Sequence, residues 1–306
     1  MILFRTNADG TVAQVKEKPF KLEREIQQLF ERNLETIMGL ELVKSEFTIK
    51  NRRIDTLAFD PQTRAFVIIE YKRDRNMSVF DQGITYLNLM LQNKADFLVE
   101  YNERGRLQLK RTEVDWSQTR VVFVSTGFTE NQIQATDFRD FSIELWKVQR
   151  YENGQIAVSP IQKSANAESI KLLGSSNAAL KTVSDEIKTY TEANQLDGKS
   201  EDVVALYDRF RSAILDLADG IEVKPQKWYV SFKQNGRNVV SVEVQKKGLK
   251  LYINAKQGEL DDPKHIARDV SDTGHWASGD YLIDKVMDDS NLEYIMSIVK
   301  SVLKQS

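Results

Sequence analysis

The sequence predicts an α/β protein in which a mixed sheet with helices against it is followed by a second, smaller α+β domain. Three observations support this prediction. Residues 21–38 carry apolar side chains at helical spacing, short apolar strand-like segments then alternate with helical ones, and the polar stretch 162–199 separates two such patterned regions. A chain of 306 residues is long enough for two ordinary domains.

The N-terminal half is expected to contain a mixed sheet built in the order α-β-β-β-α-β-α-β. Its predicted elements are a helix over 21–38, strands over 46–50, 53–59 and 65–72, a helix over 79–93, a strand over 120–126, a helix over 128–140 and a strand over 143–148. Residues 60–63, Asp-Pro-Gln-Thr, are typical of a hairpin turn. The run Phe66–Ile69 is apolar on both faces, which predicts a central strand covered on both sides.

The domain organisation follows from where the pattern weakens. We expect a first domain over 1–160, a polar linker region over 161–199 rich in Ser, Asn and Lys, and a second domain over 200–306. The second domain should contain a helix over 201–218, strands over 228–233, 239–244 and 249–254, and a C-terminal helix.

Composition excludes several kinds of site. The chain has no cysteine, so it forms no disulfide, thiolate zinc site or cysteine nucleophile, as expected of a cytoplasmic protein. Its histidines are His265 and His275, and neither lies near a nucleophile elbow, so acid–base and metal chemistry should fall to carboxylates and lysines. The apolar runs are too short to span a bilayer, so no membrane partner is expected. Because the net charge is −2, any surface for nucleic acid has to be local.

One group of residues has the pattern of a metal site. Glu70 and Lys72 lie two residues apart at the end of a buried strand, so their side chains should point to the same face. Asp55, on the preceding strand of the same hairpin, can lie beside Glu70. Two converging carboxylates repel each other unless a cation lies between them, and hard oxygen ligands suit Mg²⁺ or Mn²⁺. Lys72 would then act on the attacking water or on developing phosphorane charge.

An acid-x-Lys triplet alone is weak evidence, because a surface ion pair has the same pattern. Glu222-x-Lys224 and Asp262-x-Lys264 are further examples in this chain. The Glu70 triplet differs in its context: it ends a buried strand, and Gln82-x-x-x-Tyr86 opens the next helix.

The segments RRIDTLAF, VIIEYK and DQGITYL together resemble the PD-(D/E)XK, or restriction-endonuclease-like, nuclease superfamily over roughly residues 20 to 150. The resemblance implies an αβββαβ core and a magnesium-dependent nuclease that acts on DNA. It implies that Asp55 and Glu70 bind metal, that Lys72 assists the nucleophilic water, and that Gln82 and Tyr86 support the site or the DNA. The proline of the superfamily's name is absent, since Ile54 precedes Asp55.

Such enzymes often add a Glu from the first helix. Glu23 fits this role best as a third metal ligand, with Glu25 as the alternative, although a solvated helix residue would look the same. Likewise Gln82 could be an ordinary polar residue near a helix N-terminus, and Tyr86 a core residue.

Basic residues surround the expected cleft and are predicted to contact nucleic-acid phosphates. They are Lys50, Arg52, Arg53, Arg73 and Arg75. A solvated surface of mixed charge is the alternative for each of them.

The segment 201–306 resembles a small α+β domain of unassigned function found at the C-terminus of nuclease-like and restriction-associated proteins. The stretches KWYVSFK, KKGLKLYIN and DDPKHIARDVSDTGHWASGDY carry this resemblance. Its most site-like residues are His265, His275 and Trp276, for which packing or capping roles are the simpler interpretation.

Three functions therefore remain in view, of which one, regulatory association with a transporter or restriction complex, rests on the C-terminal domain alone. The first is a Mg²⁺- or Mn²⁺-dependent DNA endonuclease in restriction, repair or defence, acting as a homodimer or with a partner protein of such a system. The alternative is a non-catalytic module whose nuclease-like fold binds nucleic acid or protein. The Asp-Glu-Lys set favours the first, because binding alone gives no physical reason to place two carboxylates together.

Overall fold

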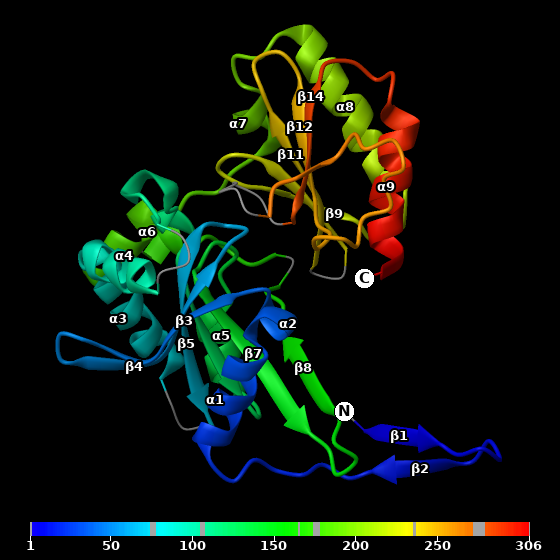
Figure 1. Cartoon of the computed structure of the whole chain (residues 1–306). Coiled ribbons are helices and arrows are strands. Elements are labelled where there is room, and N and C mark those ends of the chain that lie inside the picture. Colours follow the sequence, from blue (N-terminus) through cyan, green and yellow to red (C-terminus); the bar gives the residue numbers. More distant parts are fainter. Residues whose placement is uncertain are drawn as a thin grey trace. The chain divides into compact units, whose positions relative to one another are not determined.

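The structure is a computed structural model, and it describes residues 2–73, 78–104, 108–164, 166–173, 178–234, 237–271 and 279–305. The chain forms two compact units (Figure 1). Unit 1 comprises residues 1–60 and 64–188, and unit 2 comprises residues 61–63 and 189–306. The part of unit 1 that matters most for the site is its main sheet.

The main sheet of unit 1 is mixed, as the sequence predicts. Its strand order is β3-β4-β5-β6-β7-β8. The pairs β5–β6 and β6–β7 are parallel, and the other pairs are antiparallel. The strands are β3 (Glu41–Ile49), β4 (Arg52–Asp60), β5 (Ala65–Lys72), β6 (Arg120–Ser125), β7 (Ile143–Arg150) and β8 (Ile156–Pro160), and a separate hairpin pairs β1 (Leu3–Thr6) with β2 (Val12–Val15).

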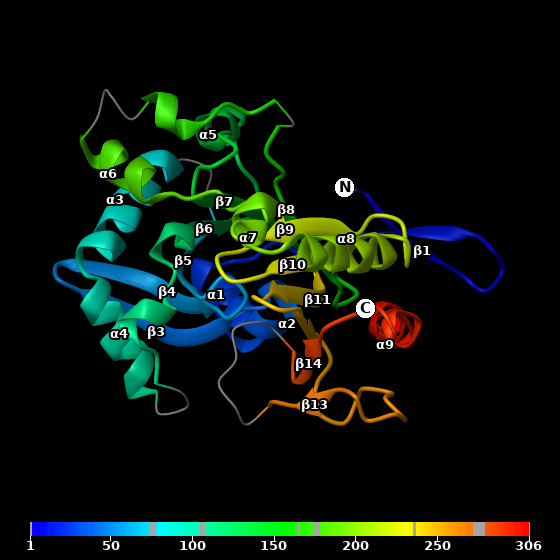
Figure 2. The same cartoon turned by 90° about the horizontal axis from the view of Figure 1, so that it is seen from above.

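Helices cover both faces of this sheet (Figure 2). One face packs on α1 (Glu23–Arg32) and α2 (Leu34–Met38). The other packs on α3 (Val79–Gln92), α4 (Lys94–Glu103) and α6 (Ala178–Glu186), with α5 (Glu130–Thr136) beside them. Short 3-10 helices occupy Arg111–Glu113, Trp116–Gln118 and Ile170–Leu173. Covered in this way, β5 is buried over all but its last residue, which confirms the prediction of a central strand.

The predicted helix over 21–38 is wrong in one respect, because it consists of two helices. Asn33 leaves the helical conformation with φ −129° and ψ 25°, and it separates α1 from α2. The break lets Phe30 and Leu34 both reach the core under the sheet. Apolar spacing alone continues smoothly across Asn33 and so did not predict it.

The predicted linker over 161–199 is also wrong. Residues 161–188 belong to unit 1, where Ile170, Leu180, Val183 and Ile187 are buried in the core. Leu180, Val183 and Ile187 follow one another at helical spacing within a polar stretch, and their burial depends on a surface that the rest of unit 1 provides.

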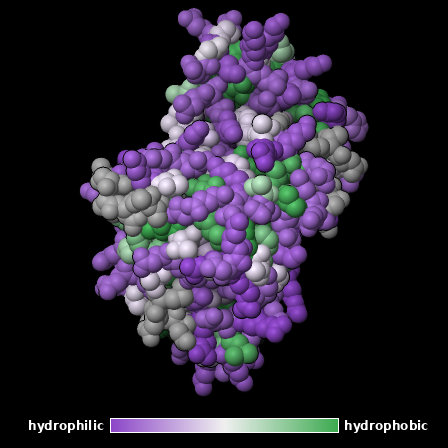
Figure 3. Space-filling model, turned by 90° about the vertical axis from the view of Figure 1, so that its left-hand side faces the viewer, coloured by the Kyte–Doolittle hydropathy of each residue, from purple (hydrophilic) through white to green (hydrophobic). Residues whose placement is uncertain are grey.

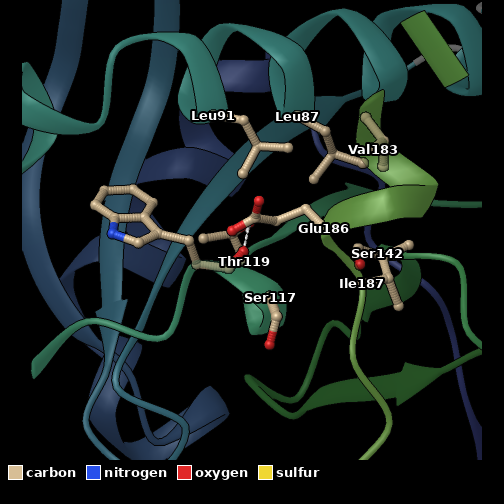
Figure 4. A pocket seen from close by; sticks show the side chains of 9 residues that line it. Leu87, Leu91, Ser117, Thr119, Ser142, Val183, Glu186 and Ile187 are labelled. Carbon is tan, nitrogen blue, oxygen red and sulfur yellow. Dashed lines mark hydrogen bonds between the residues drawn. The ribbon is translucent and has the colours of Figure 1, made fainter. Parts of the chain in front are cut away.

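The contact between this segment and α3 can be followed in Figure 4. Leu87 and Leu91 of α3 lie across a small pocket from Val183 of α6. Glu186 lies at the same pocket and bonds to Lys94 at 3.0 Å. The lining consists of apolar and hydroxyl side chains with a single carboxylate, so the pocket is a small gap in the packing of unit 1.

Unit 2 is an antiparallel sheet with helices on one face. Its strand order is β13-β14-β12-β11-β10-β9. Its elements are α7 (Glu192–Leu196), α8 (Glu201–Leu215), β9 (Glu222–Pro225), β10 (Val230–Gln234), β11 (Arg237–Val244), β12 (Leu249–Ile253), β13 (Arg268–Asp269), β14 (Tyr281–Val286) and α9 (Leu292–Gln305). Residues of α8 and α9 pack in one core with the sheet. The predicted strands and both long helices are present, whereas β9, β13 and β14 were not predicted.

Hydrophilic side chains predominate on the face shown in Figure 3, and hydrophobic ones form small separate groups there. The large apolar residues are mainly in the cores of the two units. Within the described ranges, every helix is too short or too polar to cross a membrane.

Candidate active site

The β4–β5 hairpin places the two predicted carboxylates opposite each other. Thr56 pairs with Ile69, so the next position along brings Asp55 to Glu70. The main-chain N–H of Asp55 donates to Oε1 of Glu70 at 3.2 Å, and the N–H of Tyr71 donates to Oδ2 of Asp55 at 3.0 Å. The structure therefore brings Asp55 and Glu70 together as expected.

Lys72 joins this pair from the same strand. Its Nζ lies 3.5 Å from Oε2 of Glu70. The Lys72 side chain is 19% exposed, whereas that of Glu70 is 2% exposed. The ammonium group is therefore more accessible to solvent than the buried carboxylate it contacts.

Gln82 and Tyr86 reach the site from α3. The side-chain amide of Gln82 donates to Oε2 of Glu70 and contacts the hydroxyl of Tyr86, both at 3.1 Å. The Tyr86 hydroxyl donates to the main-chain carbonyl of Arg53 at 3.3 Å. These contacts hold Glu70 in place and tie α3 to β4.

A glycine allows α3 to approach this closely. A Cβ on Gly83 would lie 2.2 Å from Cδ1 of Ile143. The helix therefore packs directly on the sheet at the residue after Gln82. This role was not predicted, although a glycine inside an amphipathic helix is a signal of close packing.

Burial shifts the acidity of both carboxyl groups. Burial, and then the neighbouring Asp55 carboxylate, raise the pKa of Glu70 to about 7, although Lys72 opposes the shift. Burial also raises the pKa of Asp55, with smaller contributions in the same direction from Glu46 and Glu23. Desolvated carboxylates this close together are costly in their charged form, and a cation between them would remove that cost.

The structure does not bring a third carboxylate into the pair. The exposed Glu23 accepts a hydrogen bond from the main-chain N–H of Arg73 at 3.1 Å, and Glu25 bonds instead to Arg150 at 3.0 Å. Within the described ranges, no three His, Asp or Glu side chains lie close enough to hold one metal ion. In this structure Glu23 bonds to the backbone and lies near enough to affect the pKa of Asp55, and its role as a metal ligand stays a prediction.

The donor set that remains fits a hard divalent cation. Asp55 and Glu70 supply carboxylate oxygens, and Mg²⁺ commonly takes one or two carboxylates and completes its shell with water and substrate phosphate. In the described part of the chain, no hydrogen-bond donor contacts Oδ1 of Asp55. That oxygen is available to a ligand.

The predicted basic residues that the structure describes lie on the surface, in the β3–β4 turn and directly after β5. Lys50, Arg52 and Arg53 are exposed around the β3–β4 turn, and Arg53 pairs with Glu46 at 2.8 Å. Arg73 is also exposed, and its guanidinium donates to the carbonyl of Lys21. Arg75 lies outside the described residues.

The other candidates in the sequence do not form comparable sites. Glu222 and Lys224 make an exposed ion pair at 3.1 Å, as expected of a surface triplet. His265 is exposed in a left-handed turn with φ 51°. His275 and Trp276 lie outside the described residues.

Gln27 is a further residue of the site that was not predicted. Its side chain is 8% exposed, and its amide donates to the main-chain carbonyl of Asp55 at 3.0 Å. Its spacing of four residues from both Glu23 and Glu31 was the available signal.

One family model and two solved structures are similar to parts of this chain. A family model described as a domain of unknown function, DUF5655, matches residues 192–301, within unit 2. Two solved structures show a partial likeness to the chain. A repair endonuclease from Pyrococcus abyssi is 18% identical, over 42% of this chain and 48% of that one, with a TM-score of 0.24. Pyrococcus furiosus SfsA in complex with Ca²⁺ is 12% identical, over 51% and 78%, with a TM-score of 0.25.

TM-scores this low do not establish a shared fold. The strong likeness is to an uncharacterized protein of Haemophilus influenzae, which is 50% identical over 299 residues and 98% of both chains. Because the match covers 98% of both chains, it extends over both units of the structure. The chain belongs to the same protein family as this Haemophilus influenzae protein.

Proposed function

We propose that the chain is a metal-dependent phosphodiesterase that cleaves DNA, with Asp55, Glu70 and Lys72 as its catalytic residues. The observation that carries the proposal is the pairing of Asp55 and Glu70 on adjacent strands, with the Glu70 carboxylate buried, Asp55 partly buried and Lys72 3.5 Å from Glu70. A stable fold gains nothing from such a pair, whereas a cation such as Mg²⁺ is commonly held by one or two carboxylates.

Asp55 and Glu70 would hold the cation, with Mg²⁺ or Mn²⁺ as the expected metal. The metal supplies charge that polarises the scissile phosphate and makes a bound water more acidic. Oδ1 of Asp55 is oriented for this task because the N–H of Tyr71 holds the other oxygen.

The remaining residues would position the reacting groups and the DNA and stabilise the charge on the phosphate. The Lys72 ammonium can orient the attacking water and stabilise the negative charge that develops on the phosphate. Gln82 keeps the Glu70 carboxylate in one orientation, and Tyr86 keeps Gln82 in place. Lys50, Arg52 and Arg53 would contact the DNA backbone next to the site.

A non-catalytic binding module is the second candidate, and one observation favours it. Donors from Asp55, Gln82 and Lys72 already contact the Glu70 carboxylate, so the group is partly satisfied without a metal. In that case the basic residues alone would bind nucleic acid or an acidic protein.

The test is cleavage of supercoiled and linear DNA with Mg²⁺, Mn²⁺ or EDTA, with RNA as a parallel substrate. We expect cleavage with either metal and none in EDTA. Asp55→Asn and Glu70→Gln should each abolish it while circular dichroism stays unchanged, because neutral isosteres lack the charge that binds the metal.

Glu222→Gln, in the surface acid-x-Lys pair, is the matched control and should cut at the wild-type rate. Unchanged rates in Asp55→Asn or Glu70→Gln at saturating Mg²⁺ would remove the metal-site assignment. A wild-type protein that binds DNA but cuts with no metal would favour the binding module.

A further inference from the structure

One stripe of α1 carries three polar residues that face the strands of the site. Glu23, Gln27 and Glu31 follow one another at intervals of four residues, which places them on the same side of a helix. The apolar residues Ile26 and Phe30 of the same helix are fully buried under the sheet. The polar stripe therefore lies along one border of the buried face of α1.

Each member of the stripe bonds to β4 or to the end of β5. Glu23 accepts from the N–H of Arg73 at 3.1 Å, directly after Lys72. The amide of Gln27 donates to the carbonyl of Asp55 at 3.0 Å. Glu31 accepts from the hydroxyl of Thr56 at 2.5 Å and from the Gln27 amide at 3.1 Å. Helix α1 thus holds the strand positions at and next to the proposed catalytic residues.

The bond from Gln27 replaces one that the sheet does not make. Ser45 pairs with Thr56 and Phe47 pairs with Ile54, but the position between them, Glu46 opposite Asp55, is left out of the β3–β4 pairing. Glu46 has a left-handed backbone with φ 54°, which interrupts a regular strand. A main-chain carbonyl shielded from water needs a donor, and for the partly buried Asp55 that donor is the Gln27 side chain.

We propose that Gln27 is a positioning residue that sets the location of Asp55, a role that rests on the proposed function of the site. Asp55 is held at three points, its carbonyl by Gln27, its N–H by the Glu70 carboxylate and its own carboxylate by the N–H of Tyr71. Because β3 does not pair with it, loss of the bond from Gln27 leaves only the two contacts to β5 to hold it. Catalytic carboxylates tolerate displacements of only about half an ångström, so this bond governs metal binding and rate.

The first measurement needs neither metal nor substrate. Gln27→Met keeps the length of the side chain but lacks the N–H donor, and Gln28→Met is the matched control at an exposed neighbour. The amide of Tyr71 donates to Asp55, so its hydrogen exchange reports how well Asp55 is held. In Gln27→Met we expect this amide to exchange about five- to tenfold faster relative to the Val67 and Ile69 amides of the same strand, the effect of losing one net hydrogen bond.

The second measurement concerns the reaction. Gln27→Met should lower Mn²⁺ affinity and the single-turnover rate by about 10- to 100-fold, the usual cost of removing a group that orients a ligand. DNA affinity in EDTA should stay unchanged. Gln27→Lys restores N–H donors between the carboxylates of Glu31 and Glu46 and should recover part of the rate. It also serves as the test variant if Gln27→Met does not fold.

The outcomes separate this inference from the proposed function. A wild type that cuts no nucleic acid overturns the proposed function, and the exchange of the Tyr71 amide still decides whether Gln27 holds Asp55. A wild type that cuts, with Gln27→Met matching Gln28→Met in exchange, Mn²⁺ affinity and rate, overturns the positioning role. Equal acceleration of the Tyr71, Val67 and Ile69 amides also overturns it, because that result indicates a general loss of stability.

Discussion

The main-chain N–H of Asp55 donates to the carboxylate of Glu70 at 3.2 Å, and the carboxylate of Asp55 accepts from the N–H that follows Glu70 in the chain. The Glu70 carboxylate is thus bonded to the backbone of Asp55, and the Asp55 carboxylate is bonded to the backbone of the residue after Glu70. Changing one residue should displace the other, so the effects of double substitutions at Asp55 and Glu70 should not add.

Lys72 should contribute to rate more than to binding. Lys72→Ala is expected to lower the single-turnover cleavage rate by about 10²- to 10⁴-fold, the range of a positioned acid–base group. DNA affinity, measured by gel shift in Ca²⁺, should change much less, because many cations share the phosphate contacts. Arg52→Ala is the control and should weaken binding and reduce the salt dependence while sparing the rate of bound DNA. Equal losses of rate and affinity in Lys72→Ala would make Lys72 a phosphate contact only.

The metal-free protein should lose stability as the pH rises through the titration of Glu70. The folded pKa is about 7 against an ordinary value of 4.5, so between these pH values the folded state binds more protons than the unfolded state. The free energy of unfolding therefore falls across this window, by on the order of 3 kcal/mol in all, and stays lower above it. Urea unfolding in EDTA at pH 4.5 and pH 8 measures the change.

Glu70→Gln should remove most of this pH dependence, whereas Glu222→Gln should retain it. Mg²⁺ should restore stability to the wild type at pH 8 more than at pH 4.5, because it binds the ionised carboxylates. An identical pH dependence in wild type and Glu70→Gln would contradict the raised pKa.

Residues 161–188 should be needed for the stability of unit 1. Leu180→Ala removes a buried side chain of α6 and is expected to lower the free energy of unfolding by about 2–5 kcal/mol. Lys181→Ala, at an exposed position of the same helix, should have little effect. A fragment ending at residue 188 should also unfold at a higher temperature than one ending at residue 160. If the two fragments melted alike, the segment would be a linker after all.

Gly83 should not tolerate a side chain. The Cβ of Gly83→Ala would meet two carbon atoms of Ile143 at 2.2 and 2.9 Å. Overpacking of about 1–3 kcal/mol should exceed the helix-propensity gain of about 1 kcal/mol, so the variant should melt at a lower temperature. Because Gln82 is the adjacent residue, cleavage should fall as well. Thr85→Ala, an exposed substitution on α3, is the control, and equal melting temperatures for the two variants would argue against close packing at Gly83.

Local pattern predicted the elements whose structure depends on their own residues. The Asp-Pro-Gln-Thr turn and the apolar run Phe66–Ile69 indicated the β4–β5 hairpin and its buried strand, because turn chemistry and strand periodicity are short-range properties. Local pattern did not predict that the segment 161–188 belongs to unit 1. Leu180, Val183 and Ile187 lie at helical spacing, but the stripe is short and only the core of unit 1 makes it internal.

For the site, the sequence by itself determined that Glu70 and Lys72 share a face and that Asp55 can lie opposite Glu70, since strands alternate with a period of two. Only the tertiary structure decided that Glu23 bonds to the backbone of Arg73 and that Gln27 holds the carbonyl of Asp55. These outcomes depend on the distance between α1 and two strands far away in sequence. The raised pKa of Glu70 is likewise set by α3 and the sheet closing over it, because desolvation is a property of the packed core and not of any segment alone.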